Sequence, residues 1–237
     1  MNTTNLTRKN MADLLLALNG TTGTPPLTVL QETSPAFHNE KDLPPIIQKL
    51  LKPVKGEIGF SLNEIVSLGN LIEFTNFPQS TVQNWVKRDV RGLIGSPQLG
   101  KKYTTEQAAM LFIVEDLKAT LDFDSIRKVL TLVFNNIDDR TDDIVNPTDL
   151  YFAYATVFDQ IHHHRGPILE TAQDSFNDTI KIFVNEKCKS LLSSFRNLKE
   201  EELSIVLNVM VLLVMTVQSG FYQAETKKYM SGALALS

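Results

Sequence analysis

The stretch STVQNWVKRDVRGLIGSPQLGKKYTTEQ, residues 80–107, decides the fold that this sequence predicts. Its first part carries apolar residues at i and i+3, Val82 and Trp85, with polar residues on the opposite helical side. This pattern predicts a short amphipathic helix that packs its apolar side on a core. Ser80 or Thr81 is the expected N-terminal cap, because short hydroxyl side chains accept bonds from the first free backbone N–H groups.

Glycines and a proline shape the second part of the stretch. Gly92 and Gly95 are expected to break the short helix. The loop GSPQLGKKY, residues 95–103, has glycine on both sides and is expected to fold as a tight hairpin. Thr104 and Gln107 then form a capping box, in which each side chain bonds a backbone N–H of the other residue. A further helix is therefore expected to start at this point.

Positive charge is concentrated in the same stretch, although the whole chain is mildly acidic, with a formal net charge of -4 and a pI near 5.6. A uniformly basic nucleic-acid coat protein is excluded, but a local basic surface is not, because binding follows the local field. Thr81, Asn84 and Arg88 share one helical face, and such side chains reach phosphates and base edges. The predicted DNA-binding residues are Thr81, Gln83, Asn84, Lys87, Arg88, Arg91, Lys101, Lys102 and Tyr103.

Helical patterns flank the stretch on both sides. Ser61 and Glu64 form a capping box at the start of an upstream helix. Downstream, apolar residues at helical spacing run from Ala108 to Leu117, and a further helix is expected to start at Asp122 or Asp124. The order of helix, turn, short basic helix, hairpin and long helix is typical of a winged helix-turn-helix domain.

These residues resemble a known family. LNEIV (62–66), RGLI (91–94), GKKY (100–103) and the segment from Leu117 to Leu130 are similar, in order and spacing, to the DNA-binding domain of the MerR family of bacterial regulators. The resemblance covers about a third of the chain. It implies a winged helix in which some residues face the major groove (Thr81, Gln83, Asn84, Arg88), others hold phosphates (Lys87, Arg91, Lys101, Lys102), and Tyr103 sets the wing.

The chain as a whole is similar to an uncharacterised bacterial family filed as domain of unknown function 1836, through STVQNWVKR, GKKYTTEQ and an Asp-rich segment. That family is described as MerR-like in its N-terminal half, so the resemblance implies a fold and a class of function but no ligand or target. Two departures from MerR stand out. The connection SLGNLIEFTNFPQ (67–79) is long, and the acidic segment 136–149 ends the helical pattern early. Dimerisation would therefore use other helices, such as the apolar residues 203–217.

Composition and turn signals divide the 237 residues into three ranges of a mainly α-helical protein. No strand alternation is convincing outside the hairpin, and three or more helices are expected after the acidic segment, within 150–164, 166–195 and 199–220. The predicted ranges are an N-terminal helical arm with a Pro/Thr-rich loop (1–56), a MerR-like winged helix-turn-helix (57–135), and a helical C-terminal domain for dimerisation or effector binding (136–237).

The remaining candidate sites favour structural explanations. The contiguous histidines 162–164 point about 100° apart on a helix and so do not share one small ion. The aspartates at 138, 139, 142 and 143 lack the order and the closing Glu of an EF-hand loop. The single cysteine, Cys188, has neighbouring lysines that can lower its pKa, but no candidate base. No phosphate-loop or hydrolase motif is present, so we expect no metal, no cofactor and no catalytic site.

The sequence therefore predicts a cytoplasmic protein that binds double-stranded DNA as a transcriptional regulator and forms a homodimer through its C-terminal helices. The single cysteine suits a reducing compartment, and the longest apolar run, residues 203–217, is shorter than the ~20 residues that a membrane span needs. The alternative is a protein-interaction module that keeps the winged-helix fold without sequence-specific DNA binding. An enzyme with an unrecognised site is the third hypothesis.

Overall fold

The computed structural model describes residues 5–33, 37–38, 43–52, 56–137, 139–163, 176–195 and 197–234. These residues form a mainly α-helical fold, and the β-type pairing among them is limited to isolated bridges. The helices are α1 (Arg8–Leu18), α2 (Pro26–Thr33), α3 (Pro45–Leu50), α4 (Leu62–Gly69), α5 (Gln79–Asn84), the π-helical turn η3 (Trp85–Asp89), α6 (Arg91–Ile94), α7 (Thr105–Leu117), α8 (Phe123–Leu130), the 3₁₀ turn η4 (Arg140–Asp142), α9 (Pro147–His163), α10 (Phe176–Leu192) and α11 (Glu200–Leu234).

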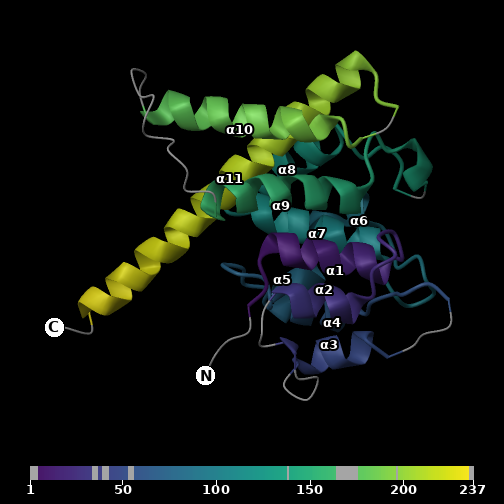
Figure 1. The fold of residues 1–237 in the computed structure, drawn as a ribbon. Coiled ribbons are helices and arrows are strands. Elements are labelled where there is room, and N and C mark those ends of the chain that lie inside the picture. Colours follow the sequence, from purple (N-terminus) through teal and green to yellow (C-terminus); the bar gives the residue numbers. More distant parts are fainter. Residues whose placement is uncertain are drawn as a thin grey trace.

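Helix α7 is the centre of the fold. Nearly all of its side chains are buried, including residues on every side of the helix, which is the pattern of a helix inside a core rather than at a surface. It packs against α1, α9 and α11, and its start contacts α6. In Figure 1 the helices lie in layers, with α10 and α11 on one side of α9 and α7, and α1, α2, α4 and α3 on the other.

The predicted capping boxes start the helices around the basic stretch. Ser61 accepts from the backbone N–H of Glu64 and caps α4, and Thr104 does the same with Gln107 at α7. Asp122 caps α8 by accepting from Ser125. These three predictions are confirmed, because a capping box depends only on residues three positions apart.

Two local predictions within the stretch are wrong. The short helix begins at Gln79 with Pro78 before it, and no side chain caps it, in place of the expected cap at Ser80 or Thr81. Gly92 does not break the helix but lies inside the short helix α6, which ends at Gly95 with a left-handed φ of 76°. The fixed φ of Pro78 suits the start of a helix, so the basic segment begins after it without a side-chain cap. A single glycine inside a helix costs only about 1 kcal/mol, so α6 tolerates Gly92.

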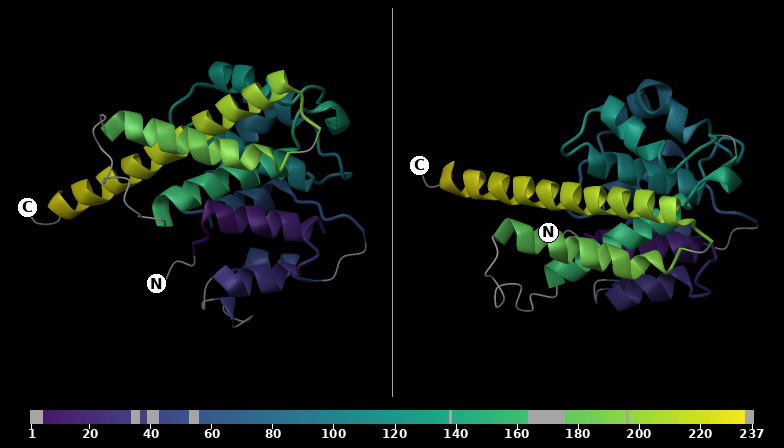
Figure 2. Two further views of the ribbon diagram at one scale, coloured as in Figure 1. Left: turned by 45° about the horizontal axis from the view of Figure 1, so that its top comes forward. Right: turned by 90° about the horizontal axis from the view of Figure 1, so that it is seen from above.

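The last helix is longer than the predicted segment, which ended at Gly220. Helix α11 continues without a break to Leu234 and has 35 residues. Gly220 stays helical where α11 crosses the end of α7, and a Cβ there would lie 3.5 Å from the Cβ of Ala119. Figure 2 shows the C-terminal part of α11 projecting beyond the other helices. Its exposed large side chains there are Tyr222, Tyr229, Met230 and Leu234.

One buried hydrophobic cluster contains residues from all three predicted ranges. Met11 of α1, Phe112 of α7 and Tyr154 of α9 belong to it. The division into three domains stays a prediction, and the helices assigned to each range share this core. Part of the predicted helix 166–195, including Pro167, lies outside the described residues.

Among the described residues, α11 is the one helix that is long and apolar enough to cross a membrane by length and composition. Its most apolar window has a mean hydropathy of 1.9 and is 39% buried inside the fold. Core helices pass the same test. The first half of α11 packs against α7, α9 and α10, with Val206, Met210, Leu213 and Val217 buried.

Candidate nucleic-acid interface

Asn70 and Phe77 hold the connection between α4 and the basic helical segment, which comprises residues 79–89. The side chain of Asn70 accepts from the backbone N–H of Phe77 and donates to its carbonyl, at 2.9 and 3.1 Å. Gly69 lies under the ring of Phe77, and a Cβ at that glycine would be 2.6 Å from a ring carbon. The close approach therefore requires glycine, and it fixes the angle between α4 and the basic segment.

The basic segment is anchored to the core by Trp85, as its apolar spacing predicted. Trp85 is 1% exposed and meets the rings of Phe77 and Phe123 edge-on, with centroids 6.1 and 6.0 Å away. The ammonium of Lys118 lies 4.7 Å from the Trp85 ring centroid. Aromatic pairs of this kind add about 0.5–1.5 kcal/mol to the effect of burial. The opposite side of the segment is left facing solvent.

The basic segment is not α-helical throughout. The N–H of Val90 donates to the carbonyl of Trp85 at 2.9 Å, an i to i−5 bond that makes residues 85–89 a single π-helical turn. Such a turn changes the direction of the side chains after it relative to a regular α-helix. Arg127 donates to the carbonyl of Asp89 and so holds the end of the turn. The α-helical spacing used to group Thr81 with Arg88 is therefore interrupted.

Gln107 connects the end of α6 to the start of α7. Its amide donates to the carbonyls of Ile94 and Ser96, at 2.7 and 2.8 Å, while its oxygen accepts from the backbone of Thr104. Arg140 of η4 donates to the carbonyl of Leu93 at 2.6 Å. These buried bonds satisfy helix-end carbonyls and fix the chain where it leaves the basic segment.

The loop 95–103, where a tight hairpin was predicted, forms a tight turn with isolated bridges in place of strands. Leu99 and Lys102 exchange two backbone hydrogen bonds of 2.9 and 3.1 Å, and Gly100 takes the left-handed φ of 65° that the turn requires. Phe60 and Tyr103 form a second antiparallel bridge, with bonds of 2.8 and 2.7 Å. The turn is thereby tied to the strand-like residue just before α4, and Lys101 and Lys102 are exposed at its tip.

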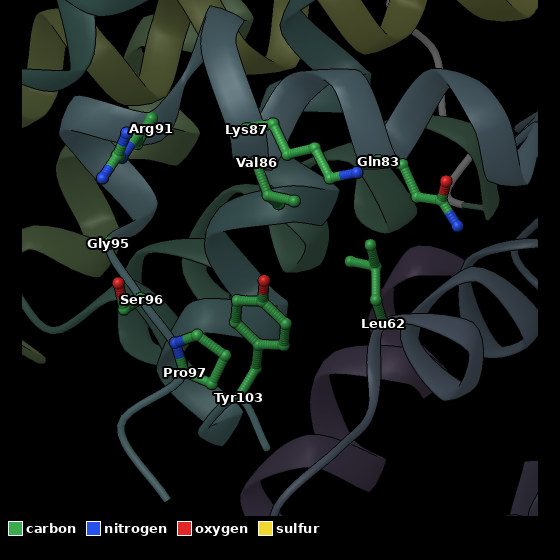
Figure 3. Close-up of a pocket in the computed structure, with 9 residues that line it drawn as sticks. All are labelled: Leu62, Gln83, Val86, Lys87, Arg91, Gly95, Ser96, Pro97 and Tyr103. Carbon is green, nitrogen blue, oxygen red and sulfur yellow. The ribbon is translucent and has the colours of Figure 1, made fainter. Parts of the chain in front are cut away.

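A groove of about 460 Å³ lies between the basic segment and this loop. Figure 3 shows Lys87 extending along it toward Gln83, with Leu62 and Tyr103 on the opposite wall and Pro97 at the side. Four predicted residues line the groove, namely Gln83, Lys87, Arg91 and Tyr103. Thr81, Asn84, Arg88, Lys101 and Lys102 lie outside its lining. The residues that the sequence reasoning did not include are Leu62, Val86, Gly95, Ser96 and Pro97.

The electrostatics of this surface are positive. Lys87, Arg91, Lys101 and Lys102 are exposed and have no carboxylate within ion-pair distance in the described part of the chain. Arg88 differs, because its Nε donates to Asp89 at 2.7 Å while its side chain stays 77% exposed. The hydrogen bond and the charge of Asp89 raise the pKa of Arg88. Burial raises the pKa of Tyr103, so its hydroxyl stays protonated.

The other sequence candidates lie away from this surface. His162 packs between the rings of Phe158 and Phe221, and its Nε2 lies 2.9 Å from Gln218 Oε1. Cys188 is buried, and burial raises the pKa of its thiol to about 12, opposite to the lowering that neighbouring lysines can cause. His164 and Asp138 lie outside the described residues. Within those residues, no three His, Cys, Asp or Glu side chains form a cluster that could hold a metal ion.

The fold and site define a helical protein with an exposed basic surface built from a short helical segment and a tight turn. The chain belongs to the family described as domain of unknown function 1836, whose sequence model matches residues 49–154, a range that includes α4 through α8. It is 35% identical over 233 residues to the uncharacterized protein YkrK of Bacillus subtilis (strain 168), which covers 96% of this chain and 97% of that protein. No solved structure matches.

Proposed function

We propose that this chain is a transcriptional regulator that binds double-stranded DNA through a MerR-like winged helix-turn-helix within residues 57–135. In this assignment α4 is the first helix of the motif, residues 79–89 are the recognition helix, and the turn at residues 99–102 is the wing. We assign the protein a binding role without catalysis, in the cytoplasm.

The observation that carries this proposal is the set of exposed cations without ion-pair partners. Lys87 and Arg91 come from the helical segment, and Lys101 and Lys102 from the turn. Two separate elements of a mildly acidic protein thus present unneutralised positive charge. Proteins that bind DNA hold the phosphates with such groups, and phosphate contacts supply most of the affinity.

The polar side chains around these cations suit the edges of bases. Thr81, Gln83 and Asn84 lie on the same short helix and carry hydroxyl and amide groups, which pair with bases in the major groove. Arg88 is the remaining base-reading residue, and its hydrogen bond to Asp89 must open or be shared when it contacts a guanine. Tyr103 sets the wing by pairing with Phe60.

The partner of this chain in DNA binding would be a second copy. Tyr222, Tyr229 and Met230 of α11 are 56%, 79% and 58% exposed on the part of the helix that projects from the body. Large apolar side chains on an extended helix are suited to contact the same helix of another copy. A homodimer would place two recognition helices on a two-fold symmetric DNA site.

The test is selection of binding sites from a random duplex library by the purified protein, followed by quantitative binding of the selected site. We expect enrichment of a discrete sequence. Arg88→Ala is expected to relax the preference at one position, by about 1–3 kcal/mol of discrimination, because it removes a base contact. Lys189→Ala is the matched control, since Lys189 is exposed on α10, which packs against α9 and α11 and contributes no residue to the groove.

A library without any enriched sequence would leave the protein-interaction module as the better assignment. The apolar part of the groove, formed by Leu62, Val86 and Pro97, favours that second function, because protein interfaces have apolar centres and polar rims. Capture of a partner by the wild type and its loss with Val86→Asp would then support it.

A further inference from the structure

The groove beside the basic segment has features that duplex DNA does not require. A recognition helix enters the major groove as a convex surface. The structure instead has a concave site of about 460 Å³ next to that helix, within the ~300–1,000 Å³ range of small-molecule pockets. Its lining comes from the start of α4, the basic segment and the loop before α7 (Figure 3).

The rim of the groove carries two cations. Lys87 lies along one edge, and Arg91 lies beside Gly95 (Figure 3). No carboxylate lines the groove, and neither cation has an ion-pair partner in the described part of the chain. A guanidinium forms two parallel hydrogen bonds with a phosphate, and an ammonium adds a point charge, so each cation suits a phosphate group. In Figure 3 the two side chains point to opposite ends of the groove, Lys87 toward Gln83 and Arg91 toward Gly95.

The floor of the groove carries the hydroxyl of Tyr103, which is open to the groove. Tyr103 is 8% exposed, and its hydroxyl points upward into the groove toward Val86 in Figure 3. This hydroxyl has no hydrogen-bond partner among the residues that the structure describes. This accessible hydroxyl is therefore free to bond a molecule that enters the groove. Gln83 and Ser96 add an amide and a second hydroxyl to the lining.

The walls of the groove are apolar. Leu62, Val86 and Pro97 line it together with the ring of Tyr103. A phosphate ion alone gains nothing from apolar walls, whereas a planar ring attached to the phosphate would be removed from water between them. Cations at the rim, hydrogen-bonding groups and apolar walls together therefore match a molecule that joins a phosphate to a planar, polar-edged ring.

We propose that the groove binds a free phosphorylated molecule with a planar ring, of the chemical class of a nucleoside monophosphate, and that this ligand competes with DNA. The long side chains of Lys87 and Arg91 rotate toward each other from their positions in Figure 3 and bond the phosphate. The ring lies between Leu62, Val86 and Pro97, and the Tyr103 hydroxyl bonds a polar edge. Lys87 and Arg91 then serve both the ligand and the DNA phosphates, so the two bind in turn. The competition rests on the proposed DNA binding, whereas binding of the ligand does not.

Calorimetric titration of the full chain with AMP and GMP tests the ligand site, with adenosine and inorganic phosphate as the separate halves. We expect saturable binding of a nucleotide and at least tenfold weaker binding of each half. Lys87→Ala and Arg91→Ala are each expected to weaken nucleotide binding about tenfold or more, since each removes a charged hydrogen bond. Tyr103→Phe keeps the ring and is expected to weaken it about two- to tenfold. Lys189→Ala should leave it unchanged.

Three results would overturn the proposal. The first is that no saturable binding is seen at millimolar nucleotide. The second is that Lys87→Ala and Arg91→Ala still bind nucleotide as the wild type does, with circular dichroism showing that both variants are folded. The third is that inorganic phosphate binds as tightly as the nucleotides. The last result would identify a simple anion site. A second titration adds nucleotide to the protein bound to its selected DNA, where release is expected. DNA binding without nucleotide binding refutes only this inference, and nucleotide binding without DNA binding refutes only the proposed function.

Discussion

Salt dependence is the sharpest test of the basic surface, because the structure determines how many charges take part. Lys87, Arg91, Lys101 and Lys102 have no ion-pair partner in the described residues, whereas Arg88 is bonded to Asp89. Neutralising Z phosphates makes log K fall with log salt at a slope of about −0.9Z. The unpaired cations therefore predict a slope of about −3.6 per bound protomer, and a loss of affinity of about 150-fold between 50 and 200 mM salt.

The variant Lys101→Ala/Lys102→Ala removes half of these charges without touching the core. We expect its slope to fall to about −1.8 and its loss over the same salt range to about 12-fold. Fluorescence anisotropy with a labelled duplex at four salt concentrations measures both slopes. The reasoning would be refuted by equal slopes for the wild type and this variant, or by a wild-type slope shallower than about −1.8. Lys189→Ala provides the baseline for removal of an exposed lysine elsewhere.

Three further predictions concern stability, each measured by urea unfolding. Gly69→Ala is expected to destabilise by about 1–3 kcal/mol, since the ring of Phe77 fills the space of the new Cβ and outweighs the helix propensity of alanine. Asp116→Ala is expected to cost about 3–5 kcal/mol, because it leaves buried Arg8 without the partner that lies 2.8 Å away, and a wild-type-like midpoint would contradict this. Burial raises the pKa of Glu115 to about 7. Its carboxyl therefore ionises at lower pH in the unfolded chain than in the folded protein, so the free energy of unfolding falls as the pH rises from about 4.5 to 7. Glu115→Gln has no carboxyl to ionise, so it should lack this fall and be more stable than the wild type by up to about 3 kcal/mol at pH 8.

The sequence predicts those parts of the fold that depend on near neighbours. The capping boxes at Ser61 and Thr104 and the cap at Asp122 involve residues three positions apart, and all three start helices where expected. The burial of Trp85 also follows from the local spacing of apolar residues. The glycine-flanked loop forms its tight turn because Gly100 alone has to adopt a left-handed φ. In each case the deciding interaction is local.

The parts that the sequence did not predict depend on distant contacts. Gly220 continues α11 because the end of α7 lies beside it, with Ala119 at van der Waals distance, and the interior of a packed helix tolerates the cost of one glycine. The π-helical turn occurs where Trp85 is held by Phe77 on one side and Phe123 on the other. The contacts with Ala119, Phe77 and Phe123 cannot be predicted from the periodicity of apolar residues within one helix. The groove is likewise built from residues as far apart as Leu62 and Tyr103.

The polar residues of the basic segment fall into two sets. Gln83, Lys87 and Arg91 line the groove, whereas Asn84 and Arg88 lie outside it. Gln83, Lys87 and Arg91 belong to both proposed activities, whereas Arg88 belongs only to base readout and the Tyr103 hydroxyl only to ligand binding, so Arg88 and Tyr103 separate the two by mutation. Arg88→Ala is expected to change the preferred DNA sequence while the affinity for AMP stays the same, and Tyr103→Phe is expected to do the reverse. If Arg88→Ala or Tyr103→Phe altered both properties equally, the segment would act as one undivided face.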